Sequence, residues 1–62
     1  MFVLIKGILI NVSEIISAEA YENTTLILFK GIDKPVKFYF TLNELRDALI
    51  KISVLWEGFS NE

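Results

Sequence analysis

The chain has 62 residues, 53% of them hydrophobic, and its six basic and eight acidic residues give a net charge of −2. A chain of this length forms one domain and buries only about 60% of the surface that its unfolded form exposes, so its stability is marginal. It contains no Cys and no His. Disulfides and the usual structural zinc site are therefore excluded, and self-association is the remaining means of stabilising so small a domain.

The first eleven residues are predicted to form a β-hairpin. Runs rich in Phe, Val and Ile at 2–6 and 8–11 flank Lys6-Gly7, which is typical of a two-residue turn. This turn sets Ile5 opposite Ile8. One side of the ribbon then carries Val3, Ile5, Ile8 and Ile10, and the other carries Phe2, Leu4 and Leu9. Both faces are apolar, whereas an antiparallel sheet with one face in water normally alternates apolar and polar residues.

The same N-terminal segment bears on location. Residues 1–5 form the longest uninterrupted apolar run, far short of the roughly 18 residues that a transmembrane helix needs. The run has no leading positive region and no small-residue cleavage site, so it predicts a strand and not a secretory signal. We expect a soluble cytoplasmic protein that makes no contact with a membrane.

A second hairpin is predicted over residues 15–22 and 25–30, after a turn at 11–14. With Asn23-Thr24 as the connection, Ala18 lies opposite Phe29 and Ala20 opposite Ile27, as expected for small residues facing large ones in a core. The other face carries Tyr21, Leu26 and Leu28.

The last third of the chain predicts a loop, a strand and a helix. Gly31 and Pro35 mark the loop, and the strand 36–40 directs Tyr39 to the side opposite its Val and Phe residues. Thr41 and Glu44 have the spacing of a capping box, which begins a helix over about 42–57, with Gly58 near its end. An apolar stripe follows at helical spacing: Leu42, Leu45, Leu49, Ile52 and Trp56.

The predicted fold class is α+β, a small antiparallel sheet of about five strands in two or three hairpins followed by one amphipathic helix. One helix covers one face of such a sheet, so apolar side chains remain on the other, and exposed apolar patches usually mark association sites. We expect a homodimer or a small ring, with the alternative that the strands curl into a barrel-like monomer. The expected interface is Tyr21, Leu26, Leu28, Tyr39, Ile50 and Val54.

The residue inventory does not favour an enzyme. Without His and Cys, acid–base or nucleophilic chemistry would fall to carboxylates, Lys, Ser or Tyr, and no paired carboxylates are evident. The glycines Gly7, Gly31 and Gly58 are too far apart for a phosphate-binding loop. We expect no catalytic residues, no cofactor and no metal.

The basic residues allow two alternatives. Lys30, Lys34 and Lys37 gather around one turn, where a solvated loop is the simplest interpretation. At an oligomer interface the same lysines, with Tyr21 and Tyr39, could line a site for a small ligand such as a nucleotide. A nucleic-acid binder of the small-barrel kind is the least favoured, because the chain is acidic and has no concentrated basic patch.

The chain resembles the small flagellar FlbD/SwrD-type proteins over most of its length in the order of its strands, turns and apolar residues. The matching segments are Lys6-Gly7, Ile10-Asn11-Val12 and the stretch from Ile15-Ile16 to Leu28. The resemblance implies a small cytoplasmic accessory protein that works by protein contacts. The chain lacks the basic C-terminal end that those proteins often carry. Our leading expectation is a non-enzymatic protein-interaction module that binds itself and another protein, as an accessory or inhibitor protein of bacterial or phage origin.

Overall fold

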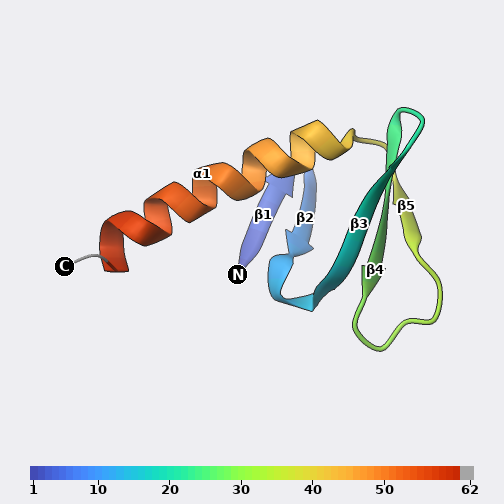
Figure 1. Ribbon diagram of the computed structural model, residues 1–62, viewed down its shortest axis with the longest axis horizontal. Helices are drawn as coiled ribbons and strands as arrows, with labels where there is room; N and C mark the ends of the chain where they lie inside the picture. Colours follow the sequence, from blue (N-terminus) through green and yellow to red (C-terminus); the bar gives the residue numbers. More distant parts are fainter. Residues whose placement is uncertain (61–62) are drawn as a thin grey trace.

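The computed structural model describes the backbone of residues 1–60 and the side chains of residues 1–52. The described residues form five strands followed by one helix, as the sequence predicts, so the α+β fold class is confirmed. Figure 1 shows how these elements are arranged. The elements are β1 (Phe2–Ile5), β2 (Ile8–Asn11), the single 3₁₀ turn η1 (Val12–Glu14), β3 (Ile15–Tyr21), β4 (Thr24–Phe29), β5 (Val36–Phe38) and α1 (Leu42–Ser60).

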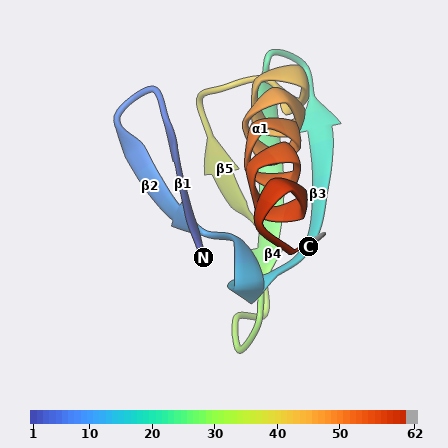
Figure 2. The ribbon, with the colours of Figure 1, turned by 90° about the vertical axis from the view of Figure 1, so that its left-hand side faces the viewer.

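The described strands are divided between two antiparallel sheets. β1 and β2 form a separate two-stranded ribbon, and the other sheet has the order β3-β4-β5. The two sheets lie beside each other on one side of α1 and do not close into a barrel (Figure 2). The barrel-like alternative is therefore not the arrangement that this chain adopts.

The first hairpin has the predicted register. Ile5 pairs with Ile8 and Val3 with Ile10, across the two-residue turn Lys6-Gly7. Both turn residues have positive φ, 49° at Lys6 and 79° at Gly7. A two-residue hairpin turn favours this left-handed backbone because its twist matches that of the strands, and Gly adopts it without steric cost.

The register predicted for the second hairpin is wrong by two residues. Ala18 pairs with Ile27 instead of Phe29, because the turn is Glu22-Asn23 and not Asn23-Thr24. Glu22 takes the left-handed conformation at φ 57°, which is costly for a residue with a side chain. A shift of two residues keeps the side chains of residues 17–21 on their predicted faces, since the strand period is two. The bulge between Ile15 and Ser17 leaves Ile16 58% exposed.

The segment after β5 differs from the prediction, because the strand ends at Phe38 and not at Phe40. Phe40 is instead buried between β5 and α1, and its ring stacks on that of Phe38 with the centroids 5.3 Å apart. Its carbonyl accepts a hydrogen bond of 2.8 Å from the hydroxyl of Thr25, which is itself fully buried. Packing and this hydrogen bond therefore replace the ladder that the strand pattern predicts.

One core joins both sheets and the helix. Its buried apolar residues are Val3, Ile5, Ile10, Ile27, Phe40 and Leu45. The helix extends to Ser60, so Gly58 does not end it where the prediction placed its end. A Gly within a helix costs only about 1 kcal/mol relative to Ala, and no Pro follows to stop the helix. The side chain of Trp56, predicted for the core, lies outside the described residues.

Candidate functional site

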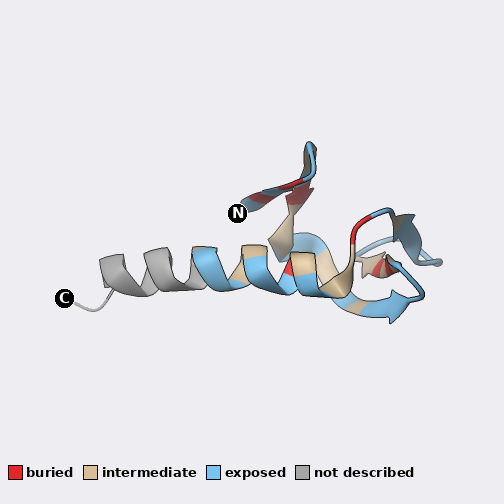
Figure 3. Ribbon diagram, turned by 90° about the horizontal axis from the view of Figure 1, so that it is seen from above, coloured by how far each residue is buried: buried red, intermediate tan, exposed pale blue. Residues whose placement is uncertain are grey.

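The outer face of the β1–β2 hairpin is an apolar surface. Phe2, Leu4 and Leu9 are 56%, 68% and 64% exposed, and Leu4 lies directly opposite Leu9. We call these three residues the hairpin face. In the view of Figure 3, buried and exposed residues alternate along β1. Burying three side chains of this size would contribute roughly 1.5–3 kcal/mol each, so the hairpin face is a strong candidate for a contact surface.

The local sequence explains why this face is both apolar and open. Side chains alternate across a strand, so Val3 and Ile5 enter the core while Phe2 and Leu4 point away from it. The helix α1 contacts the core side of the hairpin, through Leu45 and Ala48. No second layer lies on the outer side within the described residues. A two-stranded ribbon with one face in water usually carries several polar residues there, whereas this one carries Asn11, opposite Phe2, beside three large apolar side chains.

A cleft runs along β1 where the strand meets α1. Its volume is about 530 Å³, and strand residues 2–6 form one wall. The helix wall is formed by Glu44, Asp47, Ala48, Lys51 and Ile52. Lys6 closes one end, with its Nζ 3.3 Å from Oε2 of Glu44. The cleft therefore combines a strand backbone with a mixed polar and apolar helix surface.

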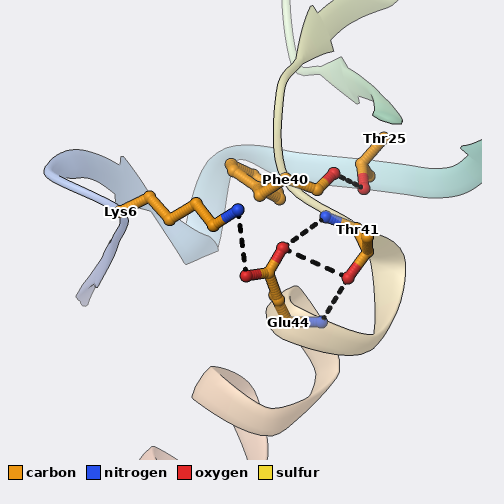
Figure 4. Close-up of polar contacts among 5 residues, drawn as sticks. All are labelled: Lys6, Thr25, Phe40, Thr41 and Glu44. Atoms are coloured by element: carbon orange, nitrogen blue, oxygen red, sulfur yellow. Dashed lines mark hydrogen bonds and ion pairs between the residues drawn. The ribbon is translucent and has the colours of Figure 1, made fainter. Parts of the chain in front are cut away.

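The predicted capping box holds the helix at this cleft (Figure 4). The Thr41 backbone N–H donates to Oε1 of Glu44 at 2.8 Å, and the Glu44 backbone N–H donates to Oγ1 of Thr41 at 3.2 Å. The hydrogen bond from the Thr41 backbone lowers the pKa of Glu44 below its usual value, and Lys6 adds to this effect while desolvation opposes it. The Glu44 carboxylate therefore links the helix start to the tip of the hairpin.

A pH-dependent contribution to stability is expected from Glu44. A carboxyl with a lowered folded-state pKa stabilises the fold fully above its unfolded pKa of about 4.3, and this contribution disappears as the pH falls through the folded-state pKa. Glu44→Gln keeps an acceptor for the Thr41 N–H but has no charge to titrate. We expect the unmodified protein to be the more stable at neutral pH and the difference to shrink on acidification.

Urea unfolding of both proteins from neutral to acidic pH measures this difference. As a control, Lys6→Met should reduce the pH dependence only in part, because the Thr41 backbone is the larger cause of the shift. Parallel stability profiles for the unmodified protein and Glu44→Gln would contradict the assignment.

Three of the predicted interface residues lie on the outer face of the three-stranded sheet: Tyr21, Leu26 and Leu28. A fourth, Tyr39, follows the last residue of β5. Tyr39 is 75% exposed and Tyr21 half exposed, but Leu26 and Leu28 are half-buried. β4 is the central strand, so Leu26 lies between Glu19 and Lys37 of its neighbours, whose long side chains can cover it. Lys37 also lies over the Tyr21 ring, with Nζ 5.4 Å from its centroid.

Ile50, the helix residue of the expected interface whose side chain the structure describes, does not lie beside the outer leucines. Ile50 is exposed on α1, which packs against the opposite face of the sheet, the face of Ala18 and Ile27. Within the described residues, α1 and the outer leucines lie on different sides of β4, so Ile50 is separated from Leu26 and Leu28 in one copy of the chain. The side chain of Val54 lies outside the described residues. The role of each of the six expected interface residues as a contact residue stays a prediction.

The lysines of the alternative ligand site do not line either of the two clefts that we find. The larger cleft is the one along β1, and a second of about 400 Å³ lies between Ala18 and the first turns of α1. Neither contains Lys30, Lys34 or Lys37, nor Tyr21 or Tyr39. The nucleotide site expected at an oligomer interface stays a prediction.

Comparison with protein-family models, with curated proteins and with solved structures finds no match to this chain. The likeness to FlbD/SwrD-type proteins therefore remains a resemblance in the order of residues. In the part of the chain that the structure describes, no helix is both long enough and apolar enough to cross a membrane. Among the same residues, no three His, Cys, Asp or Glu side chains gather as a metal ion would require.

Proposed function

We propose that this chain is a non-enzymatic protein-interaction module and that the hairpin face is its contact surface for another protein. The observation that carries the proposal is the exposure of Phe2, Leu4 and Leu9 side by side on one ribbon face. Contiguous exposed apolar side chains usually mark a protein contact. The proposal includes the accessory or inhibitory role and the cytoplasmic, bacterial or phage setting expected from the sequence.

The hairpin face also suits a contact surface mechanically. Lys6 and Gly7 fix the turn, and the inner residues Val3 and Ile10 are 3% exposed, so the ribbon is anchored on the core. An anchored apolar surface loses little conformational freedom on binding, which favours affinity. The module would therefore present a preformed surface to its partner.

Site-specific photo-cross-linking tests the proposal. A benzophenone amino acid replaces Leu9 in the full chain, which is produced in its natural cells and irradiated, and the cross-linked product is identified by mass spectrometry. We expect one reproducible protein at Leu9. The matched control places the same amino acid at Tyr39, which is 75% exposed, against 64% for Leu9, and directly follows β5 of the other sheet. It should not capture that protein.

A second substitution links the capture to the apolar surface. Leu4→Glu places a charge directly opposite position 9 without touching the core, because the Leu4 side chain is 68% exposed. We expect the cross-link at position 9 to fall by about tenfold or more, since a charge buried without a partner costs several kcal/mol. Unchanged capture, or equal capture from positions 9 and 39, would argue against the proposal.

A further inference from the structure

The free edge of β1 carries unpaired backbone groups. Val12 N–H donates to the Met1 carbonyl at 2.8 Å, and Ile5 pairs with Ile8 next to the turn. Hydrogen-bonded pairs alternate with non-hydrogen-bonded ones along an antiparallel ribbon, so the N–H and C=O of Phe2 and Leu4 point away from β2. Among the described residues, no backbone group of another element bonds to them.

This edge also lacks the features that normally prevent strand pairing. Natural edge strands carry charges, prolines or bulges that keep other strands away. The edge strand β3 has a bulge near Ile15 and a charge at Glu19, and β5 follows Pro35 and contains Lys37. β1 runs from Phe2 to Ile5 with no charge, no proline and no bulge. It is therefore open to another strand.

The helix α1 extends beyond the free edge of β1. α1 packs on the core side of β1 and continues past the free edge of that strand (Figure 1). The cleft between β1 and α1 lies along the edge, with Ala48 and Ile52 in its helix wall. A strand added beside β1 would thus gain a backbone partner and would lie against a helix surface that is partly apolar, through Ala48 and Ile52, and partly charged, through Glu44, Asp47 and Lys51.

We propose that the strand added to β1 is β1 of a second copy of this chain, related by a two-fold axis through Val3. In this register Phe2 of each copy pairs with Leu4 of the other, and Val3 faces its own equivalent. Phe2 and Leu4 of each copy then form four backbone hydrogen bonds with the same residues of the other copy. Two-fold symmetry therefore gives a partner to every outward-pointing N–H and C=O of these two residues. A continuous four-stranded sheet results, with both helices on its core side.

A second copy is the occupant that the observations favour. The pairing segment is uncharged, so an antiparallel copy opposes no like charges. The partner's Val3 and Ile5 would extend the apolar inner face beneath α1, where these residues already belong in each copy. The 62-residue chain has no Cys or His for a disulfide or a zinc site, and small domains of this kind often gain stability by self-association. The inference goes beyond the proposed function, because the edge and the hairpin face are different surfaces.

Disulfide trapping tests the register in a chain that has no cysteine of its own. Across a non-hydrogen-bonded antiparallel pair the Cα atoms are about 4.5 Å apart, which suits a disulfide. We expect Val3→Cys to form a covalent dimer under mild oxidation. Leu4→Cys should not, because its equivalent lies two residues along the neighbouring strand, beyond the limit of about 7 Å.

Ile10→Cys is the matched control for the choice of strand. Val3 and Ile10 are both 3% exposed and lie opposite each other, so the two variants disturb the core alike. In the proposed dimer, two strands separate Ile10 from its equivalent, which is about 14 Å away. Cross-linking of Ile10→Cys as readily as Val3→Cys, or no cross-linking of a folded Val3→Cys, would overturn the proposal.

Two measurements keep the test decisive if a core cysteine variant does not fold. Light scattering of the unmodified protein should give the mass of two 7.1-kDa chains, and a single-chain mass would overturn the dimer. A synthetic chain N-methylated at Leu4 loses two of the four edge hydrogen bonds, so its dissociation constant should rise by about thirtyfold. N-methylation at Leu9, on the β2 edge, should leave it unchanged, and equal effects at both positions would contradict the β1 pairing.

The outcomes separate this inference from the proposed function. A single-chain protein that still captures a partner through position 9 would overturn the dimer and keep the hairpin face. A dimer trapped through Val3 with no capture at position 9 would keep the dimer and remove the proposed function.

Discussion

Phe40→Ala should destabilise the protein by about 3–5 kcal/mol, as expected for removal of a large core aromatic side chain. Phe40 is 1% exposed and belongs to the cluster that contains Val3 and Ile5 of the hairpin, Ile27 of the other sheet and Leu45 of the helix. The two sheets share no ladder. Loss of the ring would therefore weaken the packing that keeps the hairpin attached to the rest of the domain.

Urea unfolding followed by circular dichroism measures this loss. A chain of 62 residues has a total stability of about 3–9 kcal/mol at typical values per residue, so Phe40→Ala should be partly or fully unfolded in buffer. Tyr39→Ala is the matched control. Tyr39 is the aromatic residue next to Phe40 in the sequence, but its side chain is 75% exposed. Its effect should stay within about 0.5 kcal/mol, and equal effects of the two substitutions would show that Phe40 is not the central core residue.

Thr25→Val should cost about 1–3 kcal/mol, although the two side chains have nearly the same shape. The Thr25 hydroxyl is fully buried and donates to the Phe40 carbonyl at 2.8 Å. Valine removes the donor and leaves that carbonyl without a partner in an apolar environment, which costs its desolvation free energy. The loss of free energy of unfolding is again read from urea denaturation.

Thr24→Val is the control for this substitution. The Thr24 hydroxyl donates to the Tyr21 carbonyl at 2.6 Å, but at the exposed end of the hairpin. Water can replace that donor, so the effect should stay within about 0.5 kcal/mol. A neutral Thr25→Val would mean that the Phe40 carbonyl finds another donor and that the hydrogen bond does not hold β4 to the segment before α1.

Much of the local structure could be predicted because short-range rules determine it. Lys6-Gly7 favours a two-residue turn, and that turn alone sets the register of the first hairpin. Thr41 and Glu44 begin the helix through hydrogen bonds between residues three apart. Alternation along β1 also identified Phe2 and Leu4 as one face, before any packing partner was known.

The errors arise where local preference is weak or is overruled by packing. Asn23-Thr24 has better turn residues than Glu22-Asn23, yet the core pairs Ala18 with Ile27 and leaves Glu22 in a left-handed conformation. Phe40 has the spacing of a strand residue, but burial against Phe38 and Leu45 outweighs another ladder pair. The prediction grouped Ile50 with Leu26, which are separated in one copy of the chain, because a sequence pattern assigns faces but not the side on which the helix lies.

The sequence by itself determined the elements, their apolar faces and the excess of hydrophobic surface over what one helix can cover, because each follows from residue spacing along a single strand or helix. The tertiary structure decided which of those faces stays open. By packing α1 across the inner sides of two separate sheets, it buries Val3 and Ile27 and leaves Phe2, Leu4 and Leu9 in water. Which apolar face is buried depends on contacts between segments that are distant in the sequence. The free energy of those contacts cannot be read from the residue pattern of a single strand or helix.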